Sequence, residues 1–119
     1  MSAGSSSFVD FILEQLAGMP QLRSKRFFGG IGLVSGETQF AMLMGNTLYF
    51  VVNDITRPRY EQIGSQCFAY DTKARRVQVK KYFEVPADML EDPSALLALA
   101  QEALQTARQA KLPKPKSRV

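Results

Sequence analysis

A glycine-rich run is the first feature of this chain whose residue types and spacing suggest chemistry. The run Arg26 to Leu33 reads Arg-Phe-Phe-Gly-Gly-Ile-Gly-Leu, and glycine-rich loops at helix starts can bind phosphate through backbone amides. A Walker loop, however, ends in Gly-Lys-Ser or Gly-Lys-Thr, and a dinucleotide loop opens a helix. Here a turn and a strand-like run, Thr38 to Met44, follow instead. We therefore expect a kinked strand entering a hairpin, or a close approach of a partner's backbone, rather than a phosphate site.

A basic cluster is the second candidate for chemistry. Tyr70 and Tyr82 flank it, and interleaved basic and aromatic residues can follow a phosphate backbone and stack on bases. Successive strand residues point to opposite faces, so Lys80 and Lys81 cannot belong to one patch. A solvated hairpin whose charges protect an edge strand is the simpler interpretation. The cluster consists of Lys73, Arg75, Arg76, Lys80 and Lys81.

Other chemistry is poorly supported. The chain has no histidine and one cysteine, Cys67, so a Cys–His dyad cannot form and transition-metal sites are disfavoured. The carboxylates of Glu91 and Asp92 lie at a predicted helix start, where they stabilise the helix. We therefore expect a protein that is not an enzyme and that holds no cofactor and no metal.

The charge of the chain is unevenly distributed along it. The net charge is +4, yet residues 1–110 hold eleven basic and eleven acidic side chains. We predict a single domain over 1–110 and a solvated, disordered tail over 111–119. Such a tail could add weak, salt-sensitive affinity for nucleic acid. Its basic residues are Lys111, Lys114, Lys116 and Arg118.

The location of the protein can also be anticipated. The longest apolar stretches are too short to span a membrane, and the N-terminus lacks the basic region of a signal peptide. A single cysteine suits a reducing compartment. We therefore expect a cytoplasmic protein without a membrane partner.

The pattern of apolar residues predicts an α+β fold. The expected sheet is mostly antiparallel with five strands, in the order α-β-β-β-α-β-β-α, because short links cannot make parallel crossovers. Phe27 and Phe28 are expected to anchor the core, and the neighbouring glycines to set strand curvature. The predicted helices cover 8–17, 57–63, 87–90 and a last segment starting at 92–93; the predicted strands cover 25–34, 38–44, 47–52, 67–70 and 77–83.

Several separated motifs together resemble the N-terminal domain of the TfoX/Sxy competence regulators. They follow the order and spacing of that family over roughly residues 8–108. Phe27 stands where the family usually has Met, and Ile31 where it often has an aromatic. The motifs are Arg26 to Leu33, Leu48-Tyr49-Phe50 with Asn53-Asp54, Phe68-Ala69-Tyr70, Tyr82 to Pro86, and Leu90-Glu91-Asp92. The motif positions that we assign a structural role are Arg26, Phe28, Gly29, Gly30, Gly32, Tyr49, Tyr82 and Pro86.

The resemblance implies a non-enzymatic regulatory or adaptor domain. Its partner would be a protein, either the transcription machinery or a regulator of DNA-uptake genes. Full competence regulators are similar to this domain plus a second, helical domain, so the resemblance implies the fold more directly than the role. A weak nucleic-acid binder and a small-molecule binding domain stay open as alternatives. A homodimer, formed through a strand edge or the Ala-rich last helix, also stays open.

Overall fold

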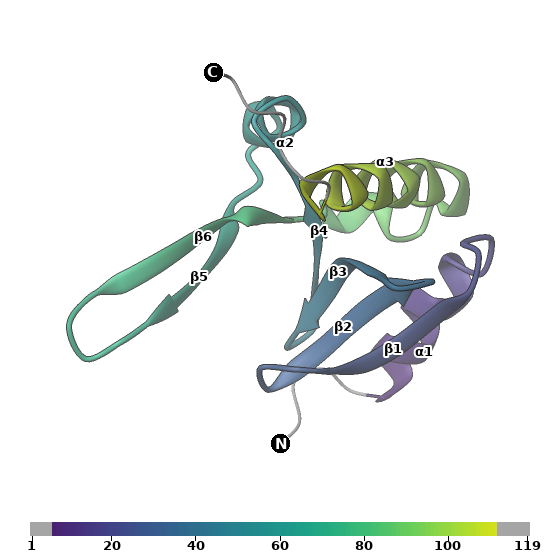
Figure 1. Ribbon diagram of the computed structural model, residues 1–119, viewed down its shortest axis with the longest axis horizontal. Helices are drawn as coiled ribbons and strands as arrows, with labels where there is room; N and C mark the ends of the chain where they lie inside the picture. The colour runs from purple at the N-terminus through teal and green to yellow at the C-terminus, as the bar shows by residue number, and fades with distance from the viewer. Residues whose placement is uncertain (1–5, 112–119) are drawn as a thin grey trace.

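The computed structural model describes residues 6–111, which form a six-stranded antiparallel sheet and three α-helices (Figure 1). The predicted α+β class is confirmed. The elements are α1 (Ser6–Gln15), β1 (Leu22–Phe27), β2 (Gly30–Ser35), β3 (Thr38–Met44), β4 (Thr47–Val51), α2 (Arg57–Gln62), β5 (Cys67–Asp71), β6 (Arg76–Glu84), the short 3₁₀ helix η1 (Ala87–Met89) and α3 (Pro93–Lys111).

The prediction of five strands was wrong, because the glycine-rich run is a turn between two strands. Phe27 pairs with Gly30, which leaves a loop of two residues between β1 and β2. Phe28 has a φ of 48° and Gly29 a φ of 80°. Two successive positive φ values are the mark of a type I′ turn, whose twist matches that of the flanking strands. The predicted strand over 25–34 is therefore a hairpin, and the element order is α-β-β-β-β-α-β-β-α.

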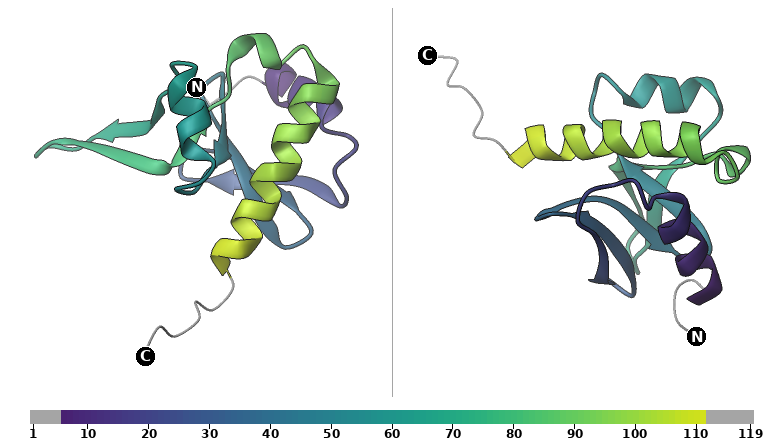
Figure 2. Two further views of the ribbon diagram at one scale, coloured as in Figure 1. Left: turned by 90° about the horizontal axis from the view of Figure 1, so that it is seen from above. Right: turned by 90° about the vertical axis from the view of Figure 1, so that its right-hand side faces the viewer.

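One hairpin leaves the body of the sheet. The strand order is β1-β2-β3-β4-β6-β5. The last part of β6, Tyr82 to Glu84, pairs with β4, whereas its first part, Arg76 to Val79, pairs with the edge strand β5. The β5–β6 hairpin (Cys67–Glu84), called the arm below, projects away from the other strands (Figures 1 and 2).

The hydrophobic core lies between one face of the sheet and the helices α1 and α3. Figure 2 shows α3 running along this face. Alanines on the buried face of α3 let its backbone approach the strands closely. Fully buried leucines and aromatic residues of the strands fill the space beneath it. The helix side of the core consists of Ile12, Leu16, Leu96, Ala100, Ala103, Leu104 and Ala107.

Helix α2 ends before a glycine in the left-handed conformation. The amide of Gly64, with a φ of 85°, donates to the carbonyl oxygen of Glu61 (3.1 Å), and that of Ser65 donates to Tyr60 (3.0 Å). This Schellman pattern requires a left-handed residue after the helix, which glycine supplies without strain. An ion pair of 2.8 Å between Arg59 and Glu102 joins α2 to α3. Helix α2 is thus anchored at the base of the arm.

A side chain at Gly30 should destabilise the fold. An added Cβ would collide with the carbonyl oxygen of Leu43 and lie 2.5 Å from Sδ of Met44. Because the oxygen belongs to the backbone of the neighbouring strand, it cannot move aside cheaply. We expect Gly30→Ala to lower the free energy of unfolding by about 1–3 kcal/mol, measured by urea denaturation.

Gly64→Asn is the matched control for Gly30→Ala. No atom lies within 4 Å of a Cβ built at Gly64, and asparagine tolerates its positive φ. The control should unfold close to the wild-type midpoint. A Gly30→Ala variant with an unchanged midpoint would contradict the close approach of β2 and β3.

Candidate functional site

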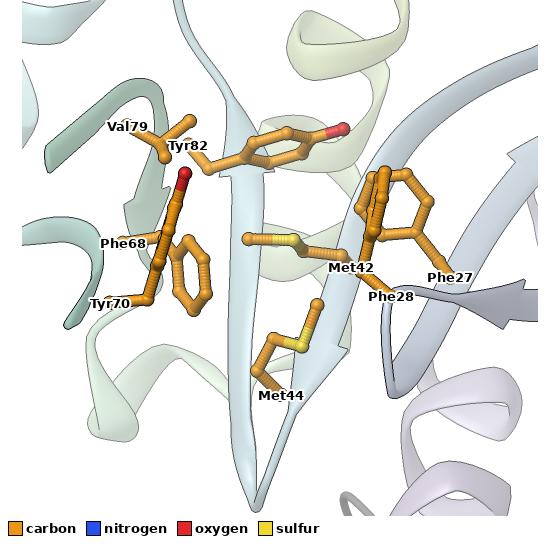
Figure 3. Close-up of a pocket in the computed structure, with 8 residues that line it drawn as sticks. All are labelled: Phe27, Phe28, Met42, Met44, Phe68, Tyr70, Val79 and Tyr82. Atoms are coloured by element: carbon orange, nitrogen blue, oxygen red, sulfur yellow. The ribbon is translucent and has the colours of Figure 1, made fainter. Parts of the chain in front are cut away.

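The face of the sheet opposite α1 and α3 carries an apolar groove of about 540 Å³ (Figure 3). One wall comes from the arm and the other from the β1–β2 turn. Figure 3 shows the methionines of β3 between these walls, with α3 behind the sheet. The lining residues are Phe27, Phe28, Met42, Met44, Phe68, Tyr70, Val79 and Tyr82.

Two glycines make room for the floor of the groove. Gly30 and Gly32 lie on the groove face of β2, where alternate residues share a face. A Cβ at Gly32 would lie 2.7 Å from Oε1 of Gln39, and one at Gly30 would meet Met44. The side chains of β3 therefore lie over a strip of β2 that has no side chains of its own. These glycines therefore permit a close cross-strand contact, and their predicted role in strand curvature stays a prediction.

Tyr82 closes the end of the groove beside β4. Its side chain is buried, and its hydroxyl accepts a hydrogen bond of 3.2 Å from Nε2 of Gln39. Burial raises the pKa of Tyr82, and the hydrogen bond from Gln39 partly opposes that rise. The phenol is thus neutral at physiological pH and already has a partner. Its hydrogen bond with Gln39 joins β6 to the floor of the groove.

Ring contacts hold the two walls. Phe27 and Phe28 meet edge to face with centroids 4.8 Å apart, and Phe68 meets Tyr49 in the same way at 5.4 Å. Such pairs contribute about 0.5–1.5 kcal/mol beyond burial. Tyr49 belongs to the body of the sheet, so its contact fixes Phe68 and the base of the arm. Burial, then the charge of Glu84 and the neighbouring thiol, raise the pKa of Tyr49.

Phe28 does not anchor the core, contrary to the prediction. Phe27 is partly buried against the core, but Phe28 is 89% exposed at the mouth of the groove. Its left-handed backbone is unfavourable for a bulky side chain. The reason is the turn: a two-residue loop lifts its first residue away from both strands. Tyr70, on the opposite wall, is 46% exposed.

Three further motif residues, Arg26, Gly29 and Pro86, do not line the groove. Gly29 supplies the second positive φ of the turn, and Arg26 is exposed on β1. Pro86 precedes η1, and its carbonyl oxygen accepts a hydrogen bond from the amide of Met89 (3.0 Å). Sequence reasoning missed the groove itself. The available signal was two strands, Thr38–Met44 and Cys67–Asp71, that place apolar side chains at alternate positions on a face without a covering helix.

The basic cluster of the arm does not form one surface. The groove side of the arm carries Phe68 opposite Val79, and Tyr70 opposite Val77. Arg76 pairs with Asp71 (3.1 Å) on the other side. Lys73 and Arg75 lie in the turn, Lys80 is exposed, and Nζ of Lys81 lies 5.8 Å from the ring centroid of Tyr82.

The tail predicted to bind nucleic acid falls largely outside the described residues. Lys111 is the last residue of α3. Its side chain and the residues Lys114, Lys116 and Arg118 lie beyond what the structure describes. Their contribution to binding stays a prediction.

The described residues hold neither a cluster of metal-ligating side chains nor a membrane-crossing helix. Within residues 6–111, no group of three or more His, Cys, Asp or Glu side chains is placed to hold a metal ion. No helix in this part of the chain is long and apolar enough to cross a membrane. Cys67 is partly buried at the start of β5, opposite Phe83, as expected for a packed thiol.

Comparison with known proteins finds a family that matches most of this chain. The family described as "TfoX N-terminal domain" matches residues 14–107, which include all eight lining residues of the groove. The chain is also 25% identical over 108 residues to the "DNA transformation protein TfoX1" of Aliivibrio fischeri. This alignment covers 91% of the chain and 49% of that protein. The chain therefore spans about half the length of this curated relative.

Replacing Phe28 by asparagine should leave the fold intact. Asn-Gly is the preferred sequence of a type I′ turn, so Phe28→Asn removes an unfavourable backbone conformation and loses one ring contact. The two effects are each about 1 kcal/mol and of opposite sign. We expect a free energy of unfolding within about 1 kcal/mol of the wild type or above it, measured by urea denaturation.

Phe27→Asn provides the contrast for this prediction, because Phe27 is partly buried against the core. It should destabilise the protein by about 2 kcal/mol or more. A comparable loss in Phe28→Asn would show that Phe28 supports the fold, against its 89% exposure.

Stability should fall at alkaline pH. Burial raises the pKa of Tyr49, Tyr60 and Tyr82 above 10.0. Above pH 10 the unfolded chain therefore releases protons that the folded chain retains, and unfolding is favoured. The free energy of unfolding should be unaffected by these groups below about pH 10 and decrease as the pH rises toward their raised pKa values. Urea denaturation between about pH 8 and pH 11 measures this.

Tyr60→Phe tests the origin of the alkaline decline. Tyr60 is buried against Phe83, with ring centroids 6.1 Å apart. The variant keeps the ring and removes the ionisable hydroxyl, so its stability should decline less steeply above about pH 10. An identical slope in wild type and variant would contradict the assignment of Tyr60 to this effect.

Proposed function

This chain belongs to the TfoX N-terminal domain family, and we propose that it is a competence-related regulatory domain that acts by binding another protein through the apolar groove. The family match and the relative named for DNA transformation support the process. The apolar groove supports the second part of the proposal, that the domain acts by binding another protein. We further propose that the domain acts in the cytoplasm, where regulators of gene expression work.

The exposure of Phe28 carries this proposal. A large aromatic side chain lies 89% exposed on a backbone with a φ of 48°. Unfavourable conformations of this kind persist at functional sites, where a requirement other than stability maintains them. An exposed apolar patch beside a groove marks an interaction surface. Phe28 and Tyr70 are the exposed residues of such a patch, and Met42 lies buried beneath them.

The chemistry of the lining favours binding over catalysis. Apart from the phenols of Tyr70 and Tyr82, every lining side chain is a hydrocarbon or a thioether. The hydroxyl of Tyr82 is held by Gln39. Acid–base and nucleophilic catalysis need a group within reach that can exchange a proton or attack. The groove offers mainly apolar surface, which suits the binding of another molecule.

A small apolar ligand is a second candidate for the groove. Its volume of about 540 Å³ falls within the roughly 300–1,000 Å³ typical of ligand pockets. Such pockets usually add several converging polar groups that orient the ligand, and here Tyr82 is already partnered. A shift in melting temperature across a metabolite panel would support this alternative, and its abolition by Phe28→Asn would place the ligand in the groove.

A genetic experiment tests the regulatory proposal. In the bacterium that carries this gene, we expect deletion to change the transcript levels of DNA-uptake genes and the transformation frequency. Chromosomal Phe28→Asn should reproduce the deletion, because it removes the exposed ring while retaining the fold. Ile55→Asn is the matched control, since Ile55 is 84% exposed but does not line the groove.

Immunoblots should show equal amounts of the three proteins. Unchanged transcripts and transformation in the deletion strain would overturn the competence role. A deletion phenotype without any effect of Phe28→Asn would place the function away from the groove.

A further inference from the structure

Charge is segregated between two parts of this molecule. The segments 22–27 and 67–84, which supply the groove walls, carry eight basic and two acidic side chains. The rest of residues 1–110 carries three basic and nine acidic ones. Most of these acidic residues lie on the helices or in the turns between them. The segments that supply the groove walls are therefore net basic, and the rest of the body is net acidic.

The basic side chains lie beside the groove and not within it. Lys25 is two residues before Phe27 and shares its face of β1, because alternate strand residues point the same way. Lys73 and Arg75 occupy the turn that follows the Tyr70 wall. All three are exposed, and we call them the basic rim. The groove is thus apolar inside with positive charge at its borders.

We propose that the groove binds an amphipathic helix of a partner protein whose polar face is acidic. This inference rests on the proposed function and specifies its partner. Apolar residues on one face of the helix would enter between Phe28 and Tyr70 and rest on Met42 and Met44. Acidic residues at the edges of that face would meet the basic rim. Methionine side chains adapt to differently shaped apolar partners, and an apolar groove accepts a helix through residues spaced i, i+3, i+4 and i+7.

The charge pattern argues against a second copy of this chain as the occupant. Joining two grooves face to face would bring together two molecules whose groove walls, taken together, each carry an excess of six positive charges. Like charges placed opposite each other at an interface are unfavourable. An acidic partner gains from the same field, which also accelerates its encounter with the groove.

The groove also fits a helix better than a nucleic acid. Base edges carry donors and acceptors, and burying them without partners is costly. The floor at Met42, Met44 and Val79 provides no such partner. Between Phe68 and Tyr70, and at Val77 and Val79, the groove side of the arm carries no cation. Lys81 of the arm lies beside the ring of Tyr82, but a single cation cannot follow a phosphate backbone.

A peptide panel tests the inference with the full chain. Three helical peptides of about 18 residues share one apolar face and differ in the polar face, which is acidic, neutral or basic. We expect the acidic peptide to bind about tenfold or more tightly than the neutral one at about 50 mM salt, measured by fluorescence anisotropy. The advantage should shrink at about 300 mM salt, and the basic peptide should bind most weakly.

Variants assign the two parts of the interaction. Phe28→Asn should weaken binding of the acidic peptide about tenfold or more, and Ile55→Asn should leave this binding unchanged. The double variant Lys25→Glu with Lys73→Glu should remove the preference for the acidic over the neutral peptide. Arg108→Glu, on α3, is the control that adds negative charge away from the groove.

The outcomes separate this inference from the proposed function. Equal binding of acidic and neutral peptides, sensitive to Phe28→Asn, would overturn the acidic partner and keep the groove as a protein site. Failure of every peptide would overturn the inference, while the genetic experiment would still decide the role of the groove. Binding of single-stranded DNA that is lost in Phe28→Asn would show that the groove binds a nucleic acid instead of an acidic helix.

Discussion

The close approach of β3 to the bare face of β2 is the contact on which the groove depends. Gly30 and Gly32 present no side chains there, so Met44 and Gln39 lie against the backbone of β2. Gln39 in turn holds the hydroxyl of Tyr82, which joins the floor to β6. A side chain at either glycine would push these groups outward and fill the groove. The same contact sets the position of the β1–β2 turn and hence of Phe28.

The two faces of the sheet have different roles. One face is covered by α1 and α3 and buries the core. The other face retains apolar side chains without a covering helix, and the arm forms a wall beside them. The exposed rings of Phe28 and Tyr70 add little to stability, because they remain in contact with water. Their presence is understandable if a partner covers them, and the acidic and basic parts of the molecule would help to orient that partner.

Much of the fold could be predicted from local signals in the sequence. The bounds of β3 follow from its apolar run between two turns, and the end of α2 follows from Gly64. The start of α3 follows from an N-cap: Oδ1 of Asp92 accepts a hydrogen bond from the amide of Ala95 (3.2 Å). The β1–β2 turn was missed because Phe-Gly is not a usual type I′ pair. The groove was missed for a different reason. Its lining extends from Phe27 to Tyr82, and a register irregularity between Cys67 and Phe68 directs the arm, so only the three-dimensional pairing brings these residues together.

The continuity of β6 has a consequence for dynamics. The part of this strand near Tyr82 is held between the body and the edge of the sheet, whereas the part near Gln78 is held by β5 alone. Protection of backbone amides from hydrogen exchange should therefore drop along a single strand, because opening of the outer part leaves the core intact. The groove consequently has a firmly held end at Tyr82 and one wall, the arm, with its own, lower opening free energy. A bound helix would raise that lower value, which couples the order of the arm to occupancy of the groove.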